Sequence, residues 1–294
     1  MRRPQKLADY IGQEQIKTLL APELARRPVR HILLTGGPGL GKTSLANLIA
    51  GEIGAEYVAL DPNATVRQQI DTLLRLDITG YNRDGSPGPG AKKFLCFIDE
   101  AHLVISPEAW LYTAMEDETV PHHGGISWIP ETTFVLATTD VAKLKKPLRD
   151  RCQVHLNLRP YTEADLCELL RRRYNVSAKL ARSVAIRARG TARLAINYCE
   201  GVLAFGGDPD AYFAAAEIDD EGLTPLDRQY LDILYGASAP VSLQSIAARL
   251  CESPKTISEM VEPYLLQTGR IEVSGKGRVL ATRGRGPKSL TLAG

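Results

Sequence analysis

The segment Gly36-Gly-Pro-Gly-Leu-Gly-Lys-Thr43 constrains the fold and the chemistry of this 294-residue chain more than any other feature. It fills the pattern G-x-x-x-x-G-K-[ST], which forms a phosphate-binding loop when a strand precedes it and a helix follows it. Both conditions are met, because residues 31–35 are mostly apolar and β-prone and residues 44–50 place leucine and isoleucine at helical spacing. The sequence therefore predicts a nucleotide-binding loop (P-loop) in an α/β domain with a parallel sheet.

Each residue type in this loop suits a triphosphate. Glycines let backbone N–H groups turn toward phosphate oxygens, and the helix that follows offers the positive end of its dipole. We expect Lys42 to reach the β- and γ-phosphates and the Thr43 hydroxyl to ligate Mg²⁺, so the predicted cofactors are ATP and Mg²⁺. The nucleotide-binding candidates in the loop are Gly36, Gly37, Pro38, Gly39, Gly41, Lys42, Thr43 and Ser44.

Two further predicted strands end in polar residues. The apolar run Phe94–Ile98 is followed by Asp99 and Glu100, about 55 residues after the P-loop. We expect Asp99 to hold the Mg²⁺ hydration shell and Glu100 to polarise the water that attacks the γ-phosphate. The next strand ends in Thr138 and Thr139, which are candidates to hydrogen-bond that water or the phosphate, although threonines at a strand end are often only structural.

The pattern of elements predicts three domains. Residues 1–157 alternate helices with short apolar strands, residues 158–222 are predicted to be a helical lid, and residues 223–294 are predicted to form a winged helix of three helices and a hairpin. The hairpin turn is expected at Ser274-Gly-Lys-Gly277. The expected strands of the first domain are His31–Thr35, Glu56–Leu60, Phe94–Ile98 and Thr133–Thr138.

Composition adds limits on location and partners. Hydrophobic residues make up 44% of the chain and no run approaches a membrane-spanning length, so we expect no membrane association. The five cysteines form no C-x-x-C pair and the N-terminus has no apolar run behind it, which favours a cytoplasmic protein without a disulfide framework or a signal peptide.

The predicted hairpin of the winged helix, called the wing below, and the segment that follows it are strongly basic, which favours binding to nucleic-acid phosphates. Lys276 and Arg278 are the DNA-binding candidates at its turn, and base-specific readout is not implied. Against one acidic residue, Glu272, the segment from residue 270 to the end carries Arg270, Lys276, Arg278, Arg283, Arg285 and Lys288.

Taken together, the motifs of this chain resemble those of the RuvB family of AAA+ ATPases, over nearly the whole chain. The resemblance implies a hexameric ring that uses ATP to drive branch migration of Holliday junctions in recombination and repair. It rests on Arg3-Pro4, Asp9-Tyr-Ile-Gly-Gln13, Gly39-Leu-Gly-Lys-Thr43, Ile98-Asp-Glu-Ala-His102, Ala114-Met-Glu-Asp117, Ala137-Thr-Thr139, Pro147-Leu-Arg-Asp-Arg151, Gly190-Thr-Ala-Arg193, Glu262-Pro-Tyr-Leu265 and Gly277-Arg-Val279.

The resemblance implies roles for further residues. Arg151 would be an arginine finger that reaches the γ-phosphate bound by a neighbouring subunit, with Thr138 or Thr139 as the first sensor and Arg193 as the second. Arg278 would contact DNA phosphate. The other nucleotide contacts implied are Arg3, Tyr10, Ile11, Arg149 and Tyr161.

Two segments depart from the family pattern. Residues 118–133 are shorter than the family's β-hairpin that docks on the junction-recognition protein RuvA, so docking of a RuvA-like partner is an open question. The Pro/Gly-rich segment Asp77–Lys93 is longer, and is either a surface excursion or a loop that projects toward a ligand or partner. The alternative function is an initiator or clamp-loader-like ATPase that uses ATP as a DNA-binding switch.

Overall fold

The structure is a computed structural model that describes residues 6–104 and 108–281. The chain forms two compact units. The first runs to Ala181 and includes Gly190–Asn197, and the second takes Arg182–Arg189 and the chain from Tyr198 onward. The predicted domain boundaries at residues 157/158 and 222/223 stay a prediction.

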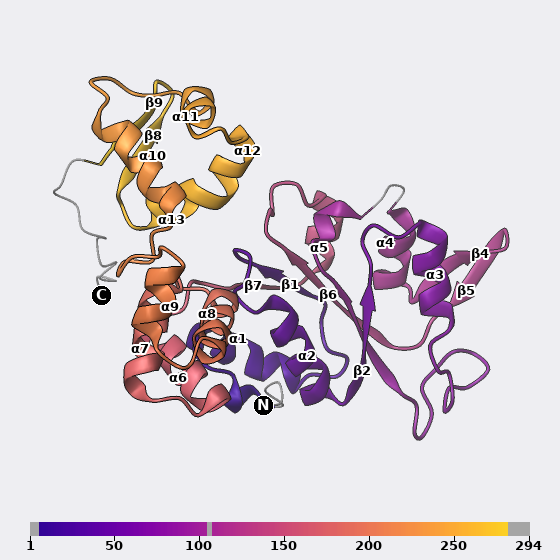
Figure 1. Cartoon of the computed structure of the whole chain (residues 1–294). Helices are drawn as coiled ribbons and strands as arrows, with labels where there is room; N and C mark the ends of the chain where they lie inside the picture. Colours follow the sequence, from indigo (N-terminus) through magenta and orange to yellow (C-terminus); the bar gives the residue numbers. More distant parts are fainter. Residues whose placement is uncertain (1–5, 105–107, 282–294) are drawn as a thin grey trace, which may run out of the picture. The chain divides into compact units, whose positions relative to one another are not determined.

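A five-stranded parallel sheet forms the centre of the first unit, in the order β2-β3-β6-β1-β7 (Figure 1). The four predicted strands are confirmed. The sequence analysis missed the edge strand β7, whose four residues alternate between buried and exposed and so give little apolar signal. The strand bounds are β1 Ile32–Thr35, β2 Ala55–Leu60, β3 Lys93–Ile98, β6 Thr132–Thr138 and β7 Val154–Asn157.

Register brings the carboxyl ends of three strands together. Thr35 at the end of β1 pairs with Thr138 at the end of β6, and Ile98 at the end of β3 pairs with Leu136 of β6. Residues that follow these strands therefore gather at one edge of the sheet, where open α/β sheets bind their ligands.

Helices of the first unit pack on this sheet. A buried cluster joins Phe134 and Ile98 of the strands to Leu73 of α3 and Trp110 of α4. The predicted helix after the P-loop is confirmed as α2, which begins at Lys42, two residues before the predicted start. The helices are α1 Glu14–Leu24, α2 Lys42–Ile53, α3 Val66–Leu74, α4 Ala109–Glu116, α5 Lys146–Arg151 and α6 Glu163–Tyr174, with short 3₁₀ turns at Leu7–Asp9 and Ala101–Leu103.

A short hairpin follows α4 in the region expected to be truncated. Its strands, β4 Thr119–His122 and β5 Gly125–Trp128, pair antiparallel over four residues each, so a hairpin is retained (Figure 1). Ile126 of this hairpin is 78% exposed.

Residues 77–92 form a closed loop packed on the hairpin. The Tyr81 hydroxyl donates to Lys92 O at 2.7 Å and accepts from Glu131 N at 2.9 Å, and the Tyr81 ring lies 5.7 Å from that of Trp128. The two ends of the loop touch, because a Cβ built on Gly80 would lie 2.6 Å from Ala91 N. The loop is therefore anchored at its base by its own aromatic residue, and whether it meets a ligand or partner stays an open question.

Three helices follow α6, and the predicted caps of α6 and α7 are present. Thr162 and Asp165 form a capping box at the start of α6, and the Ser177 hydroxyl accepts from Leu180 N at the start of α7. The sequence analysis missed α9, which Asp208 caps by accepting from Asp210 N and Ala211 N. The helices are α7 Ala178–Arg187, α8 Ala192–Ala204 and α9 Pro209–Ala215.

The second unit contains the predicted helices and hairpin of a winged helix. Caps at Thr224, Ser242 and Ser253 begin its helices as predicted, and Val241 bridges to the hairpin at Arg278. Its own core includes Tyr230, Ile246, Ile257 and Leu265. The elements are α10 Pro225–Tyr235, α11 Leu243–Leu250, α12 Pro254–Thr256, a π-helical turn Ile257–Val261, α13 Glu262–Gln267, β8 Ile271–Ser274 and β9 Gly277–Leu280.

Among the residues described, none of the helices combines the length and the apolar character that crossing a bilayer requires.

Candidate nucleotide and DNA sites

The P-loop backbone requires glycine at two positions for different reasons. Gly41 has φ +98°, and a Cβ there would lie 2.9 Å from the Tyr10 hydroxyl oxygen. Gly39 has φ +76°, and its Cβ would lie 3.0 Å from the Cβ of Arg193. The loop is thus pressed between side chains from the beginning of the chain and from α8, and only glycine fits without displacing them.

Lys42 already lies folded over this loop. Its Nζ donates to Gly36 O at 2.8 Å and to Gly37 O at 3.1 Å, and the side chain is 6% exposed. Burial lowers the pKa of Lys42, and the nearby carboxylates of Glu100 and Asp99 oppose that shift. A buried ammonium over a glycine-rich turn fits the phosphates of a nucleotide.

The proposed Mg²⁺ ligands lie next to each other. The Thr43 hydroxyl is 3.4 Å from Asp99 Oδ2, so the start of α2 and the end of β3 place a hydroxyl and a carboxylate side by side. Oxygen donors of these types are what Mg²⁺ prefers. These residues therefore fit the ion that the sequence predicts.

Glu100 is held in place by the threonine at the end of the next strand. Its Oε2 accepts from Thr139 N at 3.0 Å and from Thr139 Oγ1 at 2.8 Å. Glu100 has φ +46°, a left-handed conformation that is uncommon for a non-glycine residue and typical of functional positions. The structure thus brings the predicted base and one of the two predicted sensor threonines together.

Thr138 has a different environment from Thr139. It is fully buried, and its hydroxyl lies 2.8 Å from Nδ1 of His102 and accepts from Asp140 N at 3.0 Å. His102 also lies 3.4 Å from Glu100 Oε2, so it joins both residues. The sequence predicts no role for His102 beyond its place in the segment Ile98–His102. Its position two residues after Glu100 was the one available signal.

Tyr10 and Tyr161 meet beneath the P-loop. Their hydroxyls are 3.2 Å apart, and Tyr161 also donates to Leu40 O at 3.1 Å. Burial raises the pKa of both phenols; their hydrogen bond adds to the rise for Tyr10 and opposes it for Tyr161. Tyr10 is 4% exposed, so in this structure it supports the loop from below. The adenine-binding role of Tyr10 stays a prediction.

The predicted adenine pocket includes two other residues, Ile11 and Arg3. Ile11 is half-buried beside Tyr10. Arg3 lies outside the described residues.

Arg193 lies beside the P-loop, as the second-sensor role requires. Its backbone N donates to Gly39 O at 3.2 Å, and its positive charge contributes to the lowered pKa of Lys42. The side chain itself is exposed. An exposed cation is therefore attached to the backbone of the phosphate loop.

The two arginines of α5 differ in their surroundings. Arg149 is half-buried, and its carbonyl lies 3.2 Å from His155 Nε2. The Arg151 guanidinium is paired within its own chain. It lies 2.8 Å from Glu116 Oε2 and donates to Pro147 O at 3.0 Å.

In the wing, Arg278 forms a largely buried ion pair with Glu262 of α13. Its guanidinium lies 2.7 Å from Glu262 Oε1, and Glu262 also accepts from the hydroxyl of the fully buried Tyr230 at 2.9 Å. This pairing raises the pKa of Arg278. Lys276 is exposed at the hairpin turn. The DNA-binding role of each stays a prediction, and Lys276 is the more accessible of the two.

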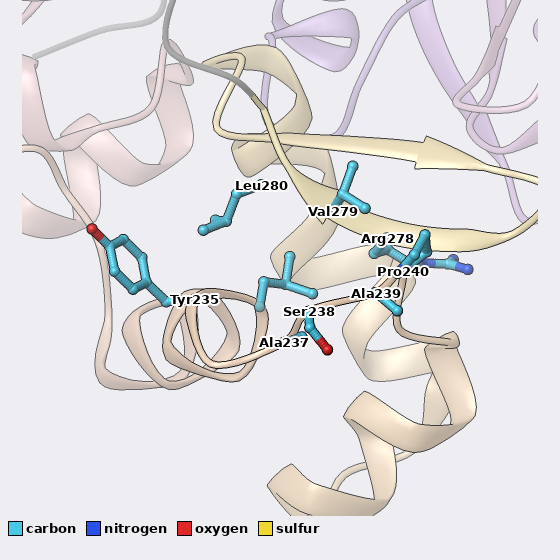
Figure 2. A pocket seen from close by; sticks show the side chains of 9 residues that line it. Tyr235, Ala237, Ser238, Ala239, Pro240, Arg278, Val279 and Leu280 are labelled. Carbon is cyan, nitrogen blue, oxygen red and sulfur yellow. The ribbon is translucent and has the colours of Figure 1, made fainter.

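A surface pocket of 460 Å³ lies between the end of α10 and β9. Figure 2 shows Tyr235 and Arg278 at opposite sides of it. Because the Arg278 charge is already satisfied by Glu262, this pocket offers no unpaired cation from that residue.

Two family models match the chain. One, described as the Holliday junction DNA helicase RuvB P-loop domain, matches residues 2–158, and the other, described as the RuvB C-terminal winged helix domain, matches residues 220–286.

Individual proteins agree with these matches. A Synechococcus sp. (strain RCC307) protein named Holliday junction branch migration complex subunit RuvB is 35% identical, covering 96% of this chain and 88% of its own. A protein of the same name from Campylobacter fetus is 32% identical, covering 95% and 86%. The structure of the Thermotoga maritima RuvB Holliday junction branch migration motor has a TM-score of 0.73 at 32% identity and covers 95% of each chain. These likenesses confirm the predicted fold class, a parallel-sheet P-loop domain with a helical region and a C-terminal winged helix.

Proposed function

Because this chain belongs to the RuvB family of AAA+ ATPases, we propose that it is an ATP-driven motor that moves on double-stranded DNA and migrates Holliday junctions in recombination and repair. The observation that carries the proposal is the meeting of Lys42, Asp99, Glu100 and Thr139 at the carboxyl edge of one sheet. The names of the relatives favour a motor over the initiator or loader alternative. We also propose a cytoplasmic location for this chain, which is consistent with an enzyme that acts on DNA.

The cofactors of this proposal are ATP and Mg²⁺. Backbone N–H groups of the P-loop and the Lys42 ammonium would bind the phosphates, and Thr43 with Asp99 would hold Mg²⁺, which neutralises phosphate charge when bound. Glu100 accepts a proton from the attacking water, and Thr139 orients the Glu100 carboxylate through its two hydrogen bonds.

A second copy of this chain would complete each ATP site. Arg151 of one copy would stabilise negative charge on the γ-phosphate held by the next copy in a ring, which the family resemblance predicts to be a hexamer. Such a finger contributes about 10³–10⁵ in rate. Arg193, fixed to Gly39 by its backbone, would report the nucleotide state to the rest of the chain.

The test of the shared site is the substitution Arg151→Ala. We expect binding of an ATP analogue to be nearly unchanged and DNA-stimulated hydrolysis to be lost. The matched control is Arg172→Ala, which removes an arginine that pairs with Glu168 on the exposed face of α6. Hydrolysis at the wild-type rate by the Arg151 variant would refute the shared site.

DNA binding has its own test. If the wing contacts about three phosphates, the logarithm of the DNA association constant falls with the logarithm of salt concentration at a slope near −3. Lys276→Ala should weaken binding to all duplex sequences alike and reduce that slope by about 1. If the DNA association constant did not depend on salt concentration, the prediction that the wing contacts DNA phosphates would be refuted.

Whether a RuvA-like partner loads the ring is a separate question. The β4–β5 hairpin presents Ile126 to solvent, which supports retention of a docking role in spite of its short length. Ile126→Asp should abolish co-purification with such a partner if the hairpin docks, and should leave it unchanged if it does not.

A further inference from the structure

Arg151 lies on a platform formed by one face of α4. The guanidinium carbon lies 4.6 Å from the centre of the Tyr112 ring, and a terminal nitrogen lies 2.8 Å from Glu116 Oε2. Tyr112 and Glu116 are four residues apart, so they are neighbours on the same side of the helix. Both contacts are made by residues of the same chain as Arg151.

The platform is itself fixed. The Tyr112 hydroxyl donates to Glu108 Oε1 at 2.8 Å, and Glu108 also lies 2.7 Å from Lys145 Nζ, just before α5. The other side of α4 is anchored in the core by Trp110 and Leu111. Helix α4 therefore provides a rigid surface against which a long, flexible arginine side chain is ordered.

The contacts orient the guanidinium without using all its donors. An arginine has five N–H groups, and here one nitrogen is directed at Pro147 O and another at Glu116. The guanidinium carbon lies over the face of the Tyr112 ring, a contact that consumes none of the N–H donors. The Arg151 side chain is 22% exposed, whereas that of Glu116 is 53% exposed. Solvent therefore screens the Glu116 charge, so the carboxylate guides the arginine more than it neutralises it.

We propose that Tyr112 and Glu116 are positioning residues that hold Arg151 in the orientation in which it meets the γ-phosphate bound by an adjacent copy of this chain. This inference rests on the proposed function, in which Arg151 acts between subunits. It gives a purpose to the segment Ala114-Met-Glu-Asp117, to which neither the sequence analysis nor the proposed function assigned a role.

Substitutions that separate the ring from the hydroxyl test the platform. Tyr112→Leu should lower kcat for DNA-stimulated ATP hydrolysis by about 10- to 100-fold with an unchanged Kd for ATP, because a misplacement of about 1 Å can cost that much. Tyr112→Phe keeps the ring and should stay within about threefold of wild type. Glu116→Gln should lower kcat by several fold. The control Glu168→Gln breaks a comparable exposed ion pair on α6 and should have no effect.

A binding measurement complements the rates. ADP with aluminium fluoride mimics the transition state, and its retention by the assembled protein depends on the finger. We expect Tyr112→Leu and Arg151→Ala to weaken this retention in parallel, while binding of a non-hydrolysable ATP analogue stays at the wild-type level. Circular dichroism of each variant excludes misfolding as the cause. If Tyr112→Leu fails to fold, Glu116→Gln carries the same test.

Mixed assemblies identify the subunit in which the defect arises. Arg151→Ala subunits retain their own site and Glu100→Gln subunits retain their finger, so mixing the two should restore hydrolysis. Adding Tyr112→Leu to the Glu100→Gln subunit should prevent that restoration. Full restoration by the doubly substituted subunit would overturn the inference, as would a faster rate for Glu116→Gln. Full activity of Arg151→Ala alone would instead refute the proposed function.

Discussion

The buried ion pair of the wing predicts a stability loss confined to the second unit. In Glu262→Leu, the Arg278 guanidinium would lose its carboxylate partner and the Tyr230 hydroxyl would lose its acceptor. Breaking a buried pair from one side costs about 3–5 kcal/mol, and an unsatisfied buried hydroxyl costs about 1–3 kcal/mol. The Arg278 side chain is 18% exposed, so water compensates part of the loss. We expect a net loss of about 3 kcal/mol.

The chain provides a way to measure this loss selectively. Both of its tryptophans, Trp110 and Trp128, lie in the first unit. Tryptophan fluorescence therefore reports unfolding of the first unit, whereas far-UV circular dichroism reports both. A loss of about 3 kcal/mol lowers Tm by about 12–24 °C in a domain of 60–100 residues. The thermal transition of Glu262→Leu followed by circular dichroism should therefore split into two steps. The transition followed by tryptophan fluorescence should keep the wild-type Tm.

The matched control removes both charges. The double variant Glu262→Leu/Arg278→Met should recover most of the loss, because replacing a buried pair with apolar residues is often neutral. An unchanged dichroism transition in Glu262→Leu, or a double variant less stable than the single one, would refute the account of this pair.

Three further predictions concern the first unit. Gly39→Ala should weaken nucleotide binding at least about tenfold in equilibrium dialysis, because the residue has φ +76° and its Cβ would lie 3.0 Å from that of Arg193; binding at the wild-type Kd would contradict this. Thr139→Val should lower kcat by about 10–100-fold with little effect on ATP binding, because Glu100 would lose the hydroxyl and its orientation; the control Thr139→Ser keeps the hydroxyl and should retain most activity. His31 is half-buried and neutral, since its Nδ1 accepts from Phe134 N at 3.1 Å, and removal from water lowers its pKa. The unfolded chain therefore gains a proton on His31 below about pH 6.5 while the native state does not. Stability measured by tryptophan fluorescence should fall as pH drops through the window just below 6.5, by up to about 1.4 kcal/mol per pH unit, and His31→Gln should weaken that dependence.

Local patterns in the sequence were sufficient to predict four strands of the sheet, the P-loop and several helix starts. Thr162 and Thr224 cap helices because the capping box depends on residues three apart, which a sequence displays directly. The edge strand β7 and the helix α9 were missed because each is short and has a weak apolar pattern. Local sequence patterns are sufficient to predict long helices and strands, whereas the formation of short ones depends on tertiary packing.

The candidate site was predicted as a set of residues, but not as a set of contacts. The sequence identified Glu100, Thr139 and Arg151, but not the partners that hold them. Arg278 was predicted to be available for DNA, whereas Glu262, sixteen residues earlier, pairs with it. Such pairings depend on where distant elements meet, and composition of the basic wing carries no information about them.

The loop at residues 77–92 has a practical consequence. Since the backbones of Gly80 and Ala91 lie close together, the loop that joins α3 to β3 returns almost to the point where it begins, and the entropy of closing such a loop rises only slowly with its length. Arg83 and Asp84 at its tip are exposed, while Tyr81 keeps its base tied down. A reporter domain or dye-labelling tag grafted between Arg83 and Asp84 would therefore leave the sheet unstrained, which offers a handle for following single molecules of this protein under a microscope.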